Sequence, residues 1–305
     1  MNAKVKMMLQ NPGLVFLSLG HRGMLNWIPD KKYLEIAYKI RLGEKPDLDH
    51  PQTFSEKIQW LKLNDRNPLY TKLVDKYEVR AYVAQKLGEE YLVPLLGGPW
   101  DSFDEIDFNA LPDRFVLKCT HDSGGSVICR DKSTLDIAAA GKKINGCLKR
   151  NYFWGQREWP YKGVKPRIIA EEYMVDESGY ELKDYKIHCF SGEPKLIQVD
   201  YGRFIRHERN IYTPDWTYIP MSIKYPTNKE HDIAKPERLE KMLEIARLLS
   251  QDIQYVRVDL YYLFGQVLFG EMTLHHGSGM ELFDPPEWDL KLGQWLALPV
   301  DHANT

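Results

Sequence analysis

Strong net charge, paired cysteines and long apolar runs are all absent from this chain of 305 residues. Its 41 basic residues nearly balance its 43 acidic residues, and the net charge is −2. Proteins that bind nucleic acid usually carry a broad basic field, so we expect no nucleic-acid partner and only local phosphate-binding cations. The cysteines lack CxxC or Cys/His metal spacing, and we interpret them as core residues in a reducing cytoplasm. They are Cys119, Cys129, Cys147 and Cys189.

No segment reaches the roughly 18 consecutive apolar residues that a membrane-spanning helix needs. The short apolar run at 14–17 follows Lys4 and Lys6 and superficially suggests a signal peptide. However, Pro12 and Gly13 interrupt the segment, and no small-residue cleavage site follows. We therefore expect an N-terminal extension packed on the body and no integral membrane segment, with peripheral membrane contact as the alternative.

Hydrophobic periodicity predicts an α+β fold with antiparallel sheets rather than a doubly wound parallel sheet. Helical patterns cover residues 31–42, 71–87, 133–149 and 236–249, and a capping box at 53–56 begins a further helix. Ser133 is the expected N-cap of the third pattern, and Pro236 is expected near the first turn of the fourth. Alternating strand patterns cover 114–120, 127–129, 167–174, 182–190, 194–201 and 255–274. Residues 202–234 show no clear periodicity.

The last of these segments, 255–274, predicts two strands joined by a tight turn around Gly265. If the turn is centred there, Asp259 lies directly opposite Glu271, on one face with Arg257 and Thr273. The other face is apolar and comprises Val258, Leu260, Leu268, Met272 and Leu274. Like charges opposed across a sheet are destabilising, and a magnesium ion shared with phosphate oxygens would relieve the repulsion. The alternative is a solvated face on which Arg257 pairs with the acids.

A second candidate is Lys118, which lies in a strand just before the small-residue loop 123–126. Backbone N–H groups of such a loop can bind phosphate oxygens, and a lysine adds a positive charge. The G-x-x-x-x-G-K-[ST] spacing of a Walker loop is absent. The alternative is a lysine that extends along the strand to reach solvent.

Three further polar clusters could line a site. The strand at 168–174 runs from apolar to acidic, and its end could offer main-chain groups to an adenine edge. Asp184 shares one strand face with Lys186 and His188, which could be solvated or could line a cleft. The arginine-rich stretch at 201–212 contains Arg203, Arg206 and Arg209 and suits a carboxylate or phosphate, or is simply a basic loop. His275 and His276 are adjacent and do not form a His-x-x-x-His metal pair.

Five segments, taken together, resemble the TupA-like family of the ATP-grasp superfamily, over roughly residues 28–298. They are TFSEKIQWLK at 53–62, VDKYEVR at 74–80, FVLKCTHDSGG at 115–125, IIAEEY at 168–173 and GEMTLHHGSG at 270–279. The resemblance implies an N-terminal extension (1–52), a helical region (53–112), a smaller ATP-grasp lobe (113–174), a larger lobe with the metal hairpin (175–298) and a tail (299–305).

The resemblance also implies roles for individual residues. Nucleotide contacts would come from Lys76, Lys118, Ser123, Gly124, Gly125, Ser126, Glu171, Glu172, Tyr173, Met174 and Asp184. Magnesium would be held by Asp259 and Glu271, with Thr273 where many ATP-grasp enzymes have asparagine. Arg257 and Lys118 would be catalytic. Independently of the resemblance, the charge of the irregular stretch at 201–212 predicts that it lies over the cleft and binds the anionic substrate through Arg203 and Arg206, and His275 and His276 are further candidates for substrate binding.

The implied activity is ATP-dependent ligation of a carboxylate to an amine through an acylphosphate. The implied substrates are a uronic acid of a surface polysaccharide and an amino acid or other amine. A metal-dependent glycosyltransferase is the enzymatic alternative, but it would show Asp-x-Asp after a Rossmann-like strand, and Asp259-Leu260-Tyr261 does not substitute for it. A nucleotide-binding scaffold without catalysis is the non-enzymatic alternative.

Overall fold

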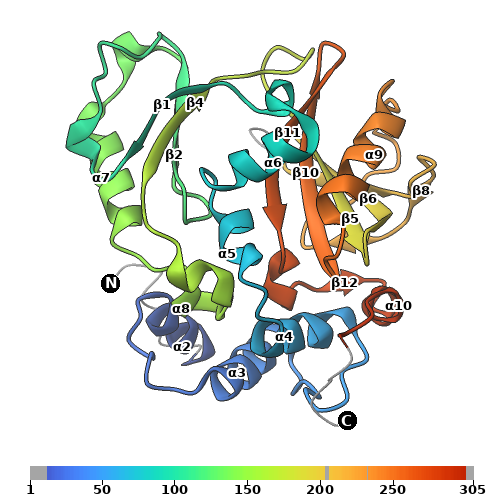
Figure 1. The fold of residues 1–305 in the computed structure, drawn as a ribbon. Helices are drawn as coiled ribbons and strands as arrows, with labels where there is room; N and C mark the ends of the chain where they lie inside the picture. The colour runs from blue at the N-terminus through green and yellow to red at the C-terminus, as the bar shows by residue number, and fades with distance from the viewer. Residues whose placement is uncertain (1–11, 203–205, 232, 300–305) are drawn as a thin grey trace.

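The computed structural model describes residues 12–202, 206–231 and 233–299 (Figure 1). The helices are α2 (Pro12–His21), α3 (Asp30–Leu42), α4 (Phe54–Asn64), α5 (Leu69–Val74), α6 (Val79–Leu87), α7 (Ile137–Leu148), α8 (Phe153–Gln156), α9 (Leu239–Ser250) and α10 (Glu287–Trp295). The strands are β1 (Leu95–Trp100), β2 (Phe115–Cys119), β3 (Ser126–Cys129), β4 (Ile168–Glu172), β5 (Asp184–Phe190), β6 (Glu193–Tyr201), β7 (Glu208–Tyr212), β8 (Tyr218–Ile219), β9 (Ser222–Ile223), β10 (Tyr255–Leu263), β11 (Gln266–Thr273) and β12 (Phe283–Asp284).

Two antiparallel sheets carry the fold, which confirms the predicted α+β class. The smaller sheet has the order β1-β4-β2-β3 and is covered by α7. The larger sheet has the order β11-β10-β5-β6-β7-β8 and is covered by α9. Figure 1 shows the two lobes side by side, with α5 and α6 between them and α2 to α4 and α10 at the base.

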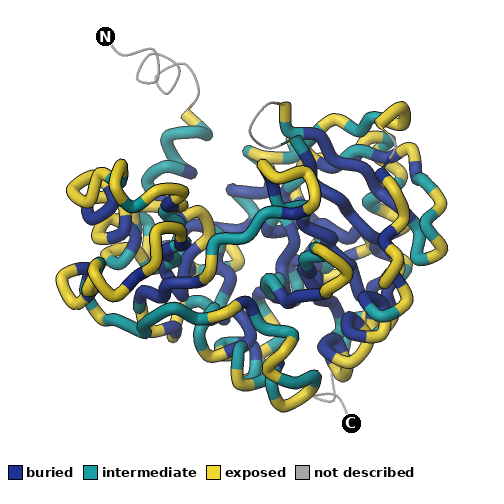
Figure 2. The backbone as a smooth tube through the Cα atoms, turned by 90° about the horizontal axis from the view of Figure 1, so that it is seen from above, coloured by how far each residue is buried: buried dark blue, intermediate teal, exposed yellow. Residues whose placement is uncertain are grey.

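The larger sheet has one apolar face and one polar face. Ile187 of β5 and Val258 of β10 pair across the strands and are fully buried against Leu243 and Ala246 of α9. Figure 2 shows this lobe as a dense group of buried strands ringed by exposed turns. Because side chains alternate along a strand, the residues between these apolar positions point to the opposite face, toward the smaller lobe. The polar face therefore forms one wall of the space between the lobes.

The predicted pairing of Asp259 with Glu271 is confirmed, although the turn differs from the prediction. Leu263 pairs with Gln266, so only two residues form the turn. That register alone would place Gly270 opposite Asp259, but a β-bulge at Gly270 restores the predicted pair. A glycine suits the bulge because a Cβ there would lie 3.0 Å from the Asp259 carbonyl oxygen.

The same bulge makes one predicted face assignment wrong. Leu268 pairs with Tyr261, so it lies on the Asp259 face and not with Val258 on the apolar face. Because the bulge offsets the two-residue turn, the strand pairing differs from the prediction only between the turn and Gly270.

Two helix predictions also need correction. The pattern at 71–87 forms two helices, because Asp75 leaves helical geometry and its Oδ1 accepts the N–H groups of Tyr77 and Glu78 at 2.8 and 3.2 Å. Helix α7 is capped by Asp136, whose side chain accepts from the Ala139 N–H, and not by Ser133.

Two other parts of the chain differ from the sequence prediction. Helix α9 begins at Leu239, three residues after Pro236. The stretch without periodicity contains strands β7 to β9. Within the described ranges, no helix combines the length and hydrophobicity needed to cross a lipid bilayer.

Candidate active site

The polar face of the larger sheet carries a buried ion-pair network centred on Asp259. Arg257 donates to both carboxylate oxygens of Asp259, from Nε at 2.6 Å and from Nη2 at 2.7 Å. Lys186 on the neighbouring strand donates to Asp259 Oδ2 at 2.6 Å. Such short, charge-assisted bonds are among the strongest in proteins. Burial raises the pKa of Asp259, while Arg257 and Lys186 oppose that rise.

Glu271, opposite Asp259, lies nearer to solvent and keeps 41% of its side chain exposed. Its Oε1 accepts from Arg257 Nη2 at 3.2 Å, and its Oε2 lies 3.8 Å from Lys76 Nζ. Although burial raises the pKa of Glu271, Lys76 and Arg257 outweigh burial and hold it at about 2. Arg257, Lys186 and Lys76 thus already compensate the charges of the two opposed carboxylates. This arrangement agrees with the alternative stated for the sequence, in which Arg257 pairs with the acids.

The donor set fits magnesium only in a phosphate-bridged arrangement. Among the residues described, no group of three His, Cys, Asp or Glu side chains could hold a metal ion. Magnesium commonly takes one or two carboxylates and completes its shell with phosphate and water. Glu271 has lone pairs open to the cleft, whereas Asp259 has three of its acceptor positions occupied by Arg257 and Lys186. Thr273 Oγ1 lies 3.5 Å from Glu271 Oε1.

A cavity of about 240 Å³ lies between the smaller sheet and the polar face. It brings together seven of the predicted nucleotide residues: Lys118, Ser126, Glu171, Glu172, Tyr173, Met174 and Asp184. Lys118 Nζ donates to Glu171 Oε2 at 2.5 Å, and Arg80 lies 3.4 Å from Glu171 Oε1. Lys118 is therefore held at the cavity wall by a carboxylate rather than extended into solvent.

The small-residue loop leads from this cavity to a second and larger one. Ser126 lines the first cavity, and Ser123 lines the second. Gly124 and Gly125 lie between them. Lys76 Nζ donates to the carbonyl oxygen of Asp122 at 2.8 Å, so the lysine connects this loop to Glu271.

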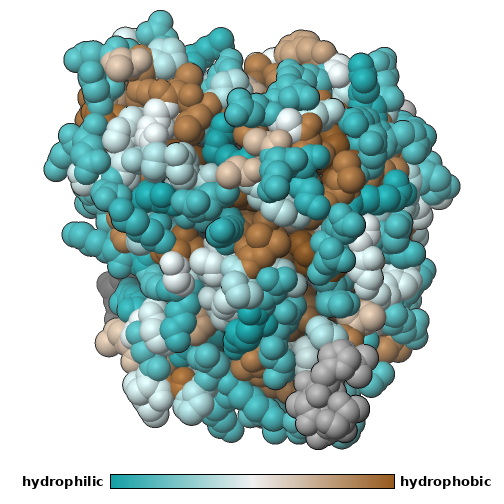
Figure 3. Space-filling view, viewed as in Figure 1, coloured by the Kyte–Doolittle hydropathy of each residue, from teal (hydrophilic) through white to brown (hydrophobic). Residues whose placement is uncertain are grey.

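The second cavity, of about 710 Å³, is polar and contains residues that the sequence reading did not single out. Predicted residues in its wall are Lys76, Ser123, Arg257, Glu271, Thr273 and His275. Added by the structure are Arg41, Tyr152, Glu158, Tyr161, Lys224, Tyr225, Ser278 and Glu281. These additions come from segments scattered between α3 and η5 (His276–Gly279), and no local pattern distinguishes them. Figure 3 shows apolar side chains in the middle of one face of a largely hydrophilic surface, between the two lobes.

Of the predicted substrate arginines, the two that the structure describes do not line this cavity. Arg203 lies outside the described residues. Arg206 is 77% exposed in its side chain, pairs with Glu208 at 3.4 Å and lines neither cavity. Arg209 is buried instead against Asp200, to which its Nε donates at 2.6 Å.

The two histidines have different positions. His275 lines the larger cavity, with Nδ1 3.6 Å from Glu158 Oε2. His276 is buried behind Arg257 and accepts from Arg257 Nη1 at 2.8 Å through Nδ1. Because arginine can only donate, His276 is the neutral tautomer with its proton on Nε2. Burial lowers its pKa well below the ordinary value, and His188 and Arg257 lower it further.

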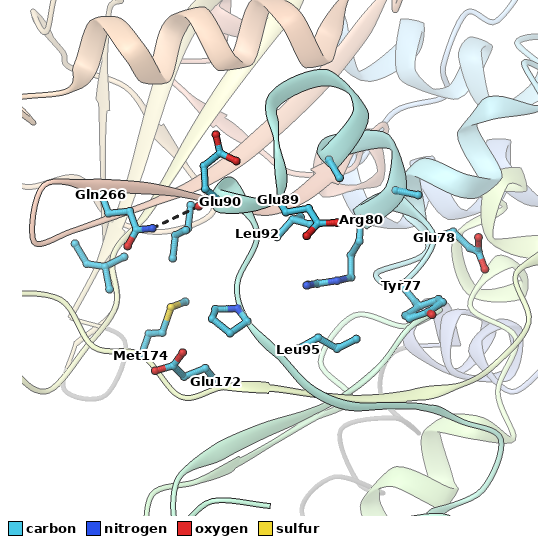
Figure 4. Close-up of a pocket in the computed structure, with 15 residues that line it drawn as sticks. Tyr77, Glu78, Arg80, Glu89, Glu90, Leu92, Leu95, Glu172, Met174 and Gln266 are labelled. Carbon is cyan, nitrogen blue, oxygen red and sulfur yellow. Dashed lines mark hydrogen bonds between the residues drawn. The ribbon is translucent and has the colours of Figure 1, made fainter.

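A third cavity, of about 740 Å³, lies behind the end of β4 (Figure 4). It is bordered by α6, η1 (Glu89–Tyr91) and the tip of the β10–β11 hairpin. Figure 4 shows Arg80 reaching into it from α6, with Glu172 and Met174 opposite. Its lining shares Glu172 with the 240 Å³ cavity but includes no lysine and neither Arg257 nor Glu271.

Two antiparallel sheets that face each other, with lysines, an arginine and opposed carboxylates between them, define the ATP-grasp fold. The chain belongs to the TupA-like ATP-grasp family, whose family model matches residues 56–297. No curated protein matches the chain.

Three solved structures illustrate the likeness of the fold. D-alanine–D-alanine ligase from Helicobacter pylori is 16% identical, with 81% of this chain and 70% of that one covered and a TM-score of 0.43. The same enzyme from Bacillus anthracis, complexed with ATP, is 14% identical, with coverages of 67% and 54% and a TM-score of 0.38. N5-carboxyaminoimidazole synthetase from Staphylococcus aureus, complexed with ADP, is 12% identical, with coverages of 67% and 45% and a TM-score of 0.41. The chain spans about half of the length of the last two, and its family assignment rests on the family model.

Proposed function

We propose that this protein is an ATP-dependent carboxylate–amine ligase. The observation that carries the proposal is the cluster of Lys76, Lys186 and Arg257 around Asp259 and Glu271, with Lys118 paired to Glu171 on the facing sheet. Phosphoryl transfer needs positioned cations more than a covalent nucleophile. The arrangement supports binding a triphosphate between the cavities, with a carboxylate substrate on the far side.

The nucleotide would occupy the 240 Å³ cavity. Its wall offers the main chain of residues 171–174 to the adenine edge, and Asp184 lies in the same wall, where it would be near the ribose. Lys118 and the small-residue loop would meet the phosphates, and Lys76 would meet them at the entrance to the larger cavity. The positions of all these residues support the nucleotide roles expected from the sequence.

Magnesium would be held by Glu271 and, through its remaining lone pair, by Asp259, with phosphate and water completing the shell. A bound magnesium ion would supply neutralisation of phosphate charge. Within the protein, Arg257 is fixed by Asp259, Glu271 and His276, which together accept four of its five N–H groups. One Nη1–H remains for a phosphoryl or carbonyl oxygen of the reacting group.

The reaction would proceed in two steps at this site. A substrate carboxylate oxygen attacks the γ-phosphorus of ATP, the bond to the ADP oxygen breaks, and an acylphosphate forms. An amine then attacks the acyl carbon, phosphate leaves with the electron pair, and the nitrogen loses a proton to give an amide. Positioned donors that stabilise the developing negative charge account for much of the catalysis in such sites, and Arg257 supplies one.

The residues that line the 710 Å³ cavity support a saccharide acid as the carboxylate substrate. Arg41, Lys76, Lys224 and Arg257 offer cations in its wall. Tyr152, Tyr161 and Tyr225 offer aromatic surfaces of the kind that stack on sugar rings. We propose a uronic acid of a surface polysaccharide or its precursor, joined to an amino acid or another amine in the cytoplasm.

A glycosyltransferase would carry Asp-x-Asp directly after a strand, and the Asp-x-Asp segment of this chain does not lie there. The segment Asp47-Leu48-Asp49 lies in the connector between α3 and α4, where Asp49 pairs with Lys31 at 2.9 Å. It follows a helix rather than a strand and lines none of the three cavities.

ADP release from ATP, measured over a panel of uronic acids and amines, tests the proposal, with mass spectrometry of the product. Release that requires both a carboxylate and an amine supports a ligase. Sugar transfer without ADP release would instead indicate a glycosyltransferase, and ATP binding without turnover over the whole panel would indicate a scaffold.

A further inference from the structure

The loop at 277–279, which follows β11, has a backbone conformation that other parts of the structure must hold in place. Gly277, Ser278 and Gly279 follow one another with φ values of 54°, 59° and 62°. The left-handed region is unfavourable for a residue with a side chain, yet Ser278 occupies it in the middle of the run. Ser278 also lines the 710 Å³ cavity. The surrounding structure must therefore hold this serine in place.

The support comes from α4, the helix of the TFSEKIQWLK segment, whose side chains the proposed reaction does not use. Lys62 Nζ donates to the carbonyl oxygen and to Oγ of Ser278, both at 2.6 Å, and to Gln59 Oε1 at 3.0 Å. Gln59 Nε2 donates to the carbonyl oxygens of Ser278 and Gly279, both at 2.9 Å. Lys62 is 1% exposed and Gln59 is fully buried.

The contact between helix and loop leaves no spare room. A Cβ on Gly279 would lie 2.5 Å from Gln59 Nε2 and 2.7 Å from the Ile58 Cβ. Gly279 is therefore needed both for its positive φ and for its close approach to α4. Two of the five segments that carry the family resemblance, 53–62 and 270–279, are thus parts of one structural unit.

The number of N–H donors on Lys62 shows in which direction the Ser278 hydroxyl hydrogen points. A lysine ammonium has three N–H donors, and all three of Lys62 are used by Gln59 and Ser278. Ser278 Oγ accepts from that cation, so its own hydrogen must point elsewhere. None of the hydrogen bonds among the described residues uses this hydroxyl as a donor, and the residue borders the cavity.

We infer that Lys62 and Gln59 form a clamp that fixes the left-handed loop 277–279. The clamp directs the Ser278 hydroxyl toward a carboxylate oxygen of the substrate in the 710 Å³ cavity. Ser278 is then a binding residue, and Lys62 is a positioning residue that acts through it. The role of Ser278 rests on the proposed function, whereas the clamp does not. Two separate measurements therefore test the clamp and the binding role of Ser278 independently.

Hydrogen–deuterium exchange at pH 6.5 tests the clamp without any substrate. In Lys62→Met we expect the peptide covering 275–280 to exchange at least tenfold faster than in the wild type. The matched control is Lys57→Met, because Lys57 lies on the same helix but donates to the carbonyl oxygens of Gly293 and Leu296 at the end of α10. Unchanged exchange of 275–280 in Lys62→Met, or an equal increase in Lys57→Met, overturns the clamp.

Calorimetry at pH 6.5, at which most of Lys62 keeps its ammonium form, tests the hydroxyl with D-glucuronate in the presence of a non-hydrolysable ATP analogue. Ser278→Gly tolerates the positive φ and removes only the hydroxymethyl group, so we expect about tenfold weaker glucuronate binding and unchanged binding of the analogue. Lys62→Met should weaken glucuronate binding at least as much, and Lys62→Arg should recover part of the loss.

A double-mutant cycle decides whether Lys62 acts through Ser278. We expect Ser278→Gly combined with Lys62→Met to bind glucuronate no more weakly than Lys62→Met alone. Fully additive losses, or equal losses for glucuronate and the ATP analogue, overturn the positioning role. If the wild type binds the analogue but not glucuronate, the hydroxyl assignment and the proposed saccharide acid both fail, while the exchange experiment still decides the clamp.

Discussion

Replacing Asp259 with asparagine is predicted to destabilise the protein strongly, in addition to any effect on catalysis. The carboxylate accepts three charge-assisted hydrogen bonds, two from Arg257 and one from Lys186, and is 1% exposed. Asparagine has one carbonyl oxygen and an NH₂ group that cannot accept. At least one cation would therefore face a donor inside the protein.

Removing one partner of a buried ion pair typically costs about 3–5 kcal/mol, because the other charge stays buried without compensation. That is a large part of the roughly 5–15 kcal/mol by which folded domains are stable. We expect Asp259→Asn to lower the free energy of unfolding in urea by about 3–5 kcal/mol. The control is Asp49→Asn, since Asp49 pairs with Lys31 at the surface and its side chain is 75% exposed. Exposed pairs contribute about 0–1 kcal/mol.

A loss in Asp259→Asn as small as that in Asp49→Asn would refute the reasoning, because it would show that the network is solvated. Glu271 is therefore a better residue than Asp259 for testing the proposed magnesium site. Asp259→Asn combines a folding defect with any catalytic defect, whereas Glu271 is 41% exposed and can be changed with less effect on folding.

Three further predictions follow from the site. Glu271→Gln should reduce ADP formation at least tenfold while lowering the urea midpoint less than Asp259→Asn does, and full magnesium-dependent activity would contradict the assignment. Lys118→Ala should weaken ATP binding by about 1.5–3 kcal/mol in calorimetry, or roughly 10- to 150-fold, and unchanged affinity would show that the lysine serves only Glu171. Burial lowers the pKa of Lys62 to about 7 against the opposing effect of Glu158, so between about pH 7 and 10.5 the unfolded chain holds a proton that the folded chain has lost. Stability should therefore rise with pH across that window, and urea titrations of Lys62→Met should show no such rise.

The amino-acid sequence by itself determined the class of fold and most of the charged residues of the candidate site. Alternation of apolar and polar residues indicates a strand, and a turn centred on Gly265 predicts the pair of Asp259 and Glu271 from spacing. The structure keeps that pair because the bulge at Gly270 offsets a shorter turn, and the spacing predicts neither of these two features. The capping box at the start of α4 is likewise a local signal, and the structure contains both of its hydrogen bonds. Lys118 and the acidic strand end were recognisable because each lies within one strand or loop.

Only the tertiary structure decided how these charges are compensated and which residues line the 710 Å³ cavity. Lys186 meets Asp259 through the pairing of β5 with β10, and the two residues are 73 positions apart. Arg41, Tyr152 and Lys224 share one cavity although they come from different parts of the chain. The same holds for Lys62 and Ser278, which are 216 positions apart. Spacing along a chain reports only local geometry, whereas these contacts arise when separate elements pack, and packing depends on the shapes of all of them at once.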